Sequence, residues 1–465
     1  MSFDRASEIF WLEYGEQIKN KVPGAGQFGR IFFLANEAQK GPPAGAYIPY
    51  EYTNKGLYDL SNNLLATDNI FYSRSALHGF DQAVGDYLNW VDLGNKDNPA
   101  LDAALLSAIQ QHEGAQAVLE REKVKALSSW QKETQMGLAT QPFPIWVDTG
   151  RAPALSAAQQ NADAIAQTII QIQLQQNGPM SPEVKRDKDA LGLGLDQSID
   201  HEGEVSGHYN MHVAAGDALT SEELIRSEQN GERVQPPFYS RAPLYDAPDY
   251  SRFVQSAMEK TSSSDYNPSE SFPVIFDARK DPSDYNFGQT RSRASVRAST
   301  GWFSFSTTGK HFSESDTLQT GPETSQVSIK VTYDNLKAIT ISTGRWVSEV
   351  SKYNLRPDSP EKVRTLAKVS QLVVVSGLGY EITVGPATSS LLDSKLREAS
   401  SAGGSISVFG LLIELGGSGG STTRKGQTHR FTWDRASRTF KVIPNYDNNY
   451  ATVVGAVGPP YGRQF

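Results

Sequence analysis

The sequence predicts an α+β fold, with an N-terminal helical domain that contains a long helical hairpin and a C-terminal antiparallel β-sandwich or barrel. Three observations predict it: helical apolar spacing over 99–138, a Pro- and Tyr-rich stretch in mid-chain, and alternating strand-like segments beyond residue 290. Because 465 residues exceed a typical domain, we expect at least two hydrophobic cores. We therefore assign residues 1–180 to the helical domain, 181–290 to an irregular Pro/Tyr-rich connection and 291–465 to the β domain.

The N-terminal part is predicted to be mostly helical, with short elements over residues 5–95. Its clearest helix follows Asn98 and Pro99, a suitable cap and first-turn pair, and continues without an internal proline. Prolines then end the pattern, and a second helix is expected near Ser156, where Gln159 completes a capping box. Two helices with matching apolar stripes across a short connection indicate an antiparallel hairpin.

The C-terminal part has the period-two alternation of β-strands, bounded by Gly, Pro, Ser or Asn. The expected strands are 302–306, 327–333, 338–341, 372–375, 380–384, 406–415, 429–433, 439–443 and 451–457, with one short helix over 389–399. Gly/Ser-rich flanks make the segment 406–415 either an ordinary central strand or a strand that pairs with another subunit. The second alternative would make the protein a homo-oligomer.

Charge is distributed unevenly along the chain. Lys+Arg against Asp+Glu is 23 to 39 over residues 1–284, a net of −16, and 21 to 13 over residues 285–465, a net of +8. Opposite charges favour docking of the two halves against one another, and this is the interpretation that we prefer. The alternative is that the basic half meets an anionic partner.

Composition excludes several classes of protein. The chain has no cysteine, so it contains no disulfide framework, thiolate nucleophile or cysteine-based zinc site. No apolar run approaches the roughly 20 residues that a membrane-spanning helix needs, and the acidic N-terminus does not resemble a signal peptide. We expect a cytoplasmic protein, or one exported without a classical signal peptide. The acidic total and the lack of a nucleic-acid motif argue against binding of DNA or RNA.

A histidine cluster is the strongest candidate site. His201, His208 and His212, together with Glu204, lie within a short acidic stretch, and imidazole and carboxylate are ligands for transition metals. His112 falls in the apolar stripe of the long helix, where it is either a hydrogen-bonded core residue or a further ligand. If these residues hold a transition metal as a cofactor, the protein is a metal-dependent oxidoreductase or hydrolase. Otherwise the cluster is a polar loop.

A basic patch supports a different function. Arg291, Arg293 and Arg297 lie just before the first expected strand and could bind an anion. With the net charge of +8, they favour a soluble binding or membrane-interacting protein whose basic β domain engages an anionic membrane or a protein partner. This is the function we expect, and the metal-dependent enzyme is its alternative.

Two glycine-rich matches to known motifs lack the structural setting that those motifs need. Residues 24–29 fit a nucleotide-binding pattern but precede a strand-like run rather than a helix. Residues 416–420 fit a hydrolase elbow by spacing alone, in a stretch rich in Gly and Ser. Neither predicts a catalytic site.

Overall fold

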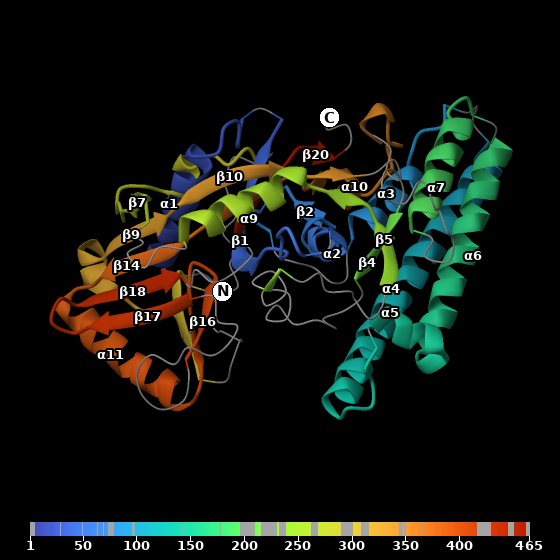
Figure 1. Cartoon of the computed structure of the whole chain (residues 1–465). Helices are drawn as coiled ribbons and strands as arrows, with labels where there is room; N and C mark the ends of the chain where they lie inside the picture. The colour runs from blue at the N-terminus through green and yellow to red at the C-terminus, as the bar shows by residue number, and fades with distance from the viewer. Residues whose placement is uncertain are drawn as a thin grey trace.

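The computed structural model has the expected α+β architecture, with a helical N-terminal region that includes a long hairpin and antiparallel sheets built mainly by the C-terminal half (Figure 1). The residues that the structure describes are 5–27, 29–48, 50–62, 64–67, 69–72, 79–94, 98–141, 143–176, 178–195, 210–214, 230–231, 239–261, 268–289, 301–307, 316–343, 347, 350–364, 366–415, 429–444 and 451–461.

The helices are distributed over the whole chain. They are α1 Arg5–Asn20, α2 Tyr50–Ser61, α3 Phe80–Asn89, α4 Pro99–Gln135, α5 Phe143–Trp146, α6 Pro153–Gln176, α7 Ser181–Leu195, α9 Pro248–Thr261, α10 Glu361–Arg364 and α11 Pro386–Ser401. Shorter helical turns are the π-helical η1 Val147–Arg151 and the 3-10 turns η2 Pro282–Asp284, η4 Gly321–Gln326 and η5 Val350–Lys352.

The strands also come from the whole chain. They are β1 Ile31–Lys40, β2 Leu64–Ala66, β3 Phe71–Tyr72, β4 Asn210–Ala214, β5 Tyr239–Pro243, β6 Tyr245–Asp246, β7 Glu270–Val274, β8 Phe303–Ser306, β9 Ser328–Tyr333, β10 Asn335–Thr340, β11 Ser342–Thr343, β12 Leu366–Lys368, β13 Gln371–Ser376, β14 Gly379–Thr383, β15 Ser405–Val408, β16 Leu411–Glu414, β17 His429–Asp434, β18 Thr439–Pro444, β19 Thr452–Gly458 and β20 Pro460–Tyr461.

The long hairpin is confirmed, and α4 and α6 lie side by side at one end of the molecule (Figure 1). The Asn98 side chain caps α4 by accepting a hydrogen bond from the Leu101 backbone, as its sequence predicts. At 37 residues, α4 is about 55 Å long. The second helix begins earlier than expected, at Pro153, so Ser156 and Gln159 are not its capping box. Proline suits the first helical turn, and Gln159 instead donates to Asp163 one turn later.

A five-stranded sheet in the order β10-β13-β19-β1-β3 lies between two hydrophobic cores. Its third and fourth strands, β19 and β1, come from opposite ends of the chain and pair antiparallel. Alternate residues of β1 enter different cores: Phe32 packs into one and Phe33 into the other. This strand lies in a region that the sequence predicts to be mostly helical, although the apolar run over 31–35 is strand-like in the sequence; it does not alternate because both of its faces are buried.

Two further sheets, β17-β18-β14-β9-β7 and β16-β15-β8, lie mainly in the β half, and the smaller sheets are β2-β12-β20, β11-β6 and β4-β5. In the part of the chain that the structure describes, the sheets stay open, so the sandwich alternative fits them and the barrel alternative does not. The expected single strand over 406–415 is instead the hairpin β15–β16, because the chain turns at Phe409 and Gly410 with positive φ of 45° and 76°. A Cβ at Gly410 would lie 2.4 Å from the Asn36 carbonyl oxygen, so this turn requires glycine.

Helix α1 is enclosed by the β half rather than by other helices. Ile9, Phe10, Trp11 and Leu12 are all fully buried, so nearly the whole circumference of α1 is covered. Its Tyr14 hydroxyl lies 3.0 Å from the Tyr380 hydroxyl of β14, and its ring stacks on Phe409.

The segment 181–290, which the sequence predicts to be irregular, contains α7 and α9. Proline at the start of α9 is compatible with a first helical turn, and Tyr250, Phe253 and Val254 place one face of this helix in a core. The boundaries at 180 and 290 stay predictions. Among the described helices, none has the length and apolar character needed to cross a membrane.

Candidate functional site

Most of the predicted histidine cluster lies outside the described residues: His201, Glu204 and His208 belong to this part of the chain. The backbone of His212 lies in β4, where it pairs with Arg241 of β5. Within the described residues, no group of three or more His, Asp or Glu side chains is arranged to hold a metal ion. The metal site therefore stays a prediction. The basic patch of Arg291, Arg293 and Arg297 also lies outside the described residues.

His112 is described, and it is a buried residue of α4 with 8% of its surface exposed. Its Nε2 lies 3.3 Å from the Gln116 side-chain nitrogen one turn later. Burial, and then the charge of Lys188, lower the pKa of His112. These contacts fit the interpretation as a core histidine.

Lys188 forms an unusual polar contact at the base of the hairpin. Its Nζ donates to Asn89 Oδ1 of α3 at 2.7 Å and to Gln173 Oε1 of α6 at 2.8 Å. Both amide side chains are buried, and burial lowers the pKa of Lys188 to about 7. The amine nitrogen is thus held by neutral oxygens, an arrangement that joins α7 to α3 and α6.

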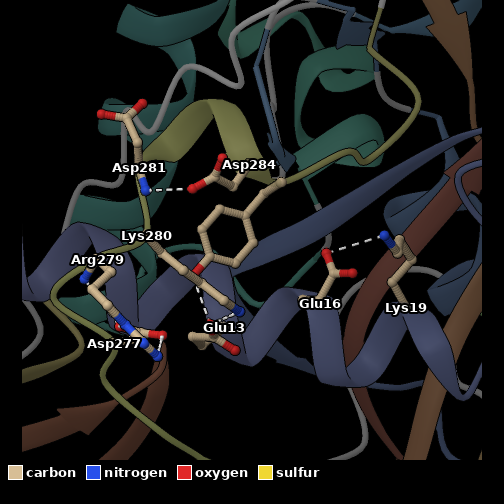
Figure 2. A network of polar contacts seen from close by, with 9 residues as sticks. Glu13, Glu16, Lys19, Asp277, Arg279, Lys280, Asp281 and Asp284 are labelled. Carbon is tan, nitrogen blue, oxygen red and sulfur yellow. Dashed lines mark hydrogen bonds and ion pairs between the residues drawn. The ribbon is translucent and has the colours of Figure 1, made fainter.

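A second buried polar group ties α1 to the segment 277–285 (Figure 2). Figure 2 shows Glu13 and Lys280 pointing toward one another, and the Glu13 carboxylate accepts from Lys280 and, at 2.7 Å, from the Tyr285 hydroxyl. Burial, and then this bond to Glu13, raise the pKa of Tyr285. Glu13 is 5% exposed and both of its partners come from the segment 277–285, so these bonds hold α1 against that segment.

Exposed arginines gather at the far end of the β half, where α11 meets the β17–β18 turn. Asp393 of α11 accepts from Arg397, from Arg435 Nε at 2.6 Å and from Trp433 Nε1 at 3.1 Å. Burial would raise the pKa of Asp393, but these three hydrogen bonds outweigh it and lower the value.

The same turn also contains Asp434, which accepts hydrogen bonds from the Ala436 backbone and the Ser437 hydroxyl. The side chains of Arg397 and Arg435 are 67% and 64% exposed although they share this one carboxylate. Arg438 lies in the same turn and is also exposed. We call Arg397, Arg435 and Arg438 the arginine cluster.

Some charged side chains of the basic half form ion pairs with carboxylates of the acidic half. Lys352 of the basic half lies 2.9 Å from Asp187 of α7, and Lys337 lies 3.8 Å from Asp249 of α9. These ion pairs fit the interpretation that the halves dock on one another.

The α4–α5 connection carries exposed apolar side chains. Met136 is 65% exposed and Leu138 is 63% exposed, more than the other large exposed hydrophobic residues of the described chain except Ile275 at 64%. We call Met136, Gly137 and Leu138 the hairpin tip. Its residues are visible in the sequence just before a proline, but no pattern there reveals that they project from the molecule.

Comparisons of the chain with protein-family models, with curated proteins and with solved structures found no match. The functional argument therefore rests on the residues themselves.

Proposed function

We propose that the protein is a binding protein whose basic C-terminal half attaches to an anionic membrane surface. The arginine cluster carries this proposal, because two highly exposed guanidinium groups share one carboxylate and a third arginine lies in the same turn. Guanidinium groups bind lipid phosphates as paired hydrogen-bond donors. The predicted patch of Arg291, Arg293 and Arg297 would add to the same charge.

Flotation with vesicles tests the proposal. Phosphatidylcholine vesicles that contain phosphatidylserine should carry the protein upward in a gradient, whereas pure phosphatidylcholine vesicles should not. Recovery should fall as ionic strength rises from about 0.01 M to about 1 M, because the Debye length shrinks from about 30 Å to about 3 Å. Equal recovery with both kinds of vesicle, or none with either, overturns the proposal.

A charge variant makes the test specific to the arginine cluster. Replacing Arg435 and Arg438 by Gln should weaken vesicle binding about 30-fold, at about 1 kcal/mol for each basic residue near the surface. Replacing Lys185 and Arg186 by Gln is the matched control, since these two side chains of α7 are 44% and 69% exposed and lie in the acidic half. Equal losses in the two variants would show that total charge, and not this cluster, matters.

The metal-dependent enzyme stays the alternative prediction, and it depends on residues outside the described part of the chain.

A further inference from the structure

The first part of α4 and the whole of α6 lie antiparallel along the base of the hairpin. The side chain of Gln176 donates to Asp102 at 2.8 Å at one end, and Leu119 belongs to a small core shared with α6 at the other. Residues 99–119 and 153–176 therefore form one two-helix unit.

The exposed residues of this unit are almost free of charge. In the two ranges 22 residues are exposed, 10 on α4 and 12 on α6, and Asp163 is the one charged side chain among them. The chain as a whole has 21% charged residues, which would give about five at random. We call these 22 exposed residues the neutral surface.

The need to form a helix does not explain the neutral surface. The rest of α4, residues 120–135, has 10 exposed residues, and four of them are charged: Arg121, Lys123, Lys125 and Lys132. Glu, Lys and Arg favour a helix about as well as Gln does, so charge is compatible with the same helix. Protein interfaces, in contrast, are depleted in Lys, Glu and Asp.

The chemistry of the neutral surface indicates a second copy of this chain as its partner. Eight of its side chains are amides: Gln110, Gln111, Gln159, Gln160, Asn161, Gln167, Gln171 and Gln175. Each amide both donates and accepts hydrogen bonds, so two identical surfaces can satisfy one another about a two-fold axis. Because the chain has a net charge of −8, a contact through a surface with one carboxylate also avoids most of the repulsion between copies.

The unit is large enough for a stable dimer. The 24 residues of α6 span about 36 Å, and two packed helices are about 20 Å wide. One broad side therefore offers about 700 Å² on each copy, or about 1,400 Å² in total. Specific protein–protein interfaces bury about 1,200–2,000 Å².

We propose that two copies of the chain associate through their neutral surfaces, with two helical hairpins packed as a four-helix arrangement about a two-fold axis. This inference is independent of the proposed function, because the arginine cluster lies on α11 and the β17–β18 turn.

Sedimentation velocity tests the association on the full chain. Between about 1 µM and 100 µM protein, the mass should rise from that of one chain to that of two. Raising the ionic strength to about 1 M should leave the dimer intact, because contacts between neutral side chains are not screened by salt.

A pair of isosteric charge variants locates the interface. Gln110→Glu together with Gln171→Glu should weaken the dimer about 100-fold, because like charges that face one another across an interface repel. Gln131→Glu together with Gln135→Glu is the matched control: both residues are exposed on α4 beyond the neutral surface, and the added charge is the same. The control should dimerise like the wild-type protein, and circular dichroism checks that both variants keep their helices.

Four results would overturn the inference. A single-chain mass at every concentration excludes the dimer, and a mass that continues to rise beyond two chains excludes a closed two-fold contact. Dissociation in salt shows that the oppositely charged halves of two copies hold the assembly instead. Equal behaviour of the two charge variants shows that the neutral surface is not the interface.

Discussion

A buried histidine at the edge of the β half should make that edge sensitive to acid. His429 begins β17, is 5% exposed, and its Nε2 lies 2.9 Å from the Leu378 carbonyl oxygen. Because a carbonyl only accepts hydrogen bonds, Nε2 carries a proton whether the ring is neutral or charged. Burial lowers the pKa of His429 from 6.5 to about 4, although the bond to Leu378 opposes the change.

The direction of the pH effect follows from these two values. Between pH 6.5 and 4 the opened state binds a proton that the folded state does not, so stability present above pH 6.5 is lost as pH falls toward 4. The full difference is about 3.4 kcal/mol, at about 1.36 kcal/mol for each pKa unit. By pH 5 the free energy of opening has fallen by about 2 kcal/mol, which corresponds to about a 30-fold increase in the population of the opened state.

Hydrogen exchange measured by mass spectrometry on peptides that cover β17 reports this local opening. The matched control is His429→Gln, because its amide can donate to the same carbonyl and has no proton to gain. After correction for the intrinsic pH dependence of exchange, the wild-type protein should lose about 2 kcal/mol more than the variant between pH 7 and pH 5. Equal losses in both proteins would refute the argument.

Four further outcomes are expected. The free energy of unfolding of the wild-type protein should rise by about 3 kcal/mol between pH 7 and pH 9.5, because the amine of Lys188 is neutral in the folded state and charged in the unfolded state. Lys188→Met should abolish this rise, and urea titrations at both pH values measure it. Tyr285→Phe should cost about 1.5 kcal/mol in thermal unfolding, since the hydroxyl donates to the buried carboxylate of α1. Gly458→Ala should cost about 3 kcal/mol in urea unfolding, because its Cβ would lie 1.9 Å from a backbone oxygen. If the histidine cluster holds a metal, elemental analysis should find about one equivalent of a transition metal, and His208→Ala should remove it; metal-free protein would contradict that site.

Local chemistry in the sequence determined the long hairpin and most C-terminal strands. Asn98 caps α4 because its side chain reaches the backbone three residues ahead, and helical spacing fixes which side of α4 packs against α6. Period-two alternation likewise located β9, β14 and β18, because each is bounded by turn residues within a few positions. These features depend on neighbours a few residues away.

Tertiary structure alone decided which distant segments meet. β1 pairs with β19 across most of the chain, and the strand-like run over 31–35 does not reveal which distant strand it pairs with. The turn at Gly410 is likewise set by the approach of the Asn36 backbone. The candidate surfaces also depend on the tertiary structure. Asp393 and Arg435 are far apart in sequence but form a hydrogen bond, and Leu138 is exposed because no other described segment packs over it. Burial and exposure are properties of the packed chain, so the sequence fixes them only through the fold.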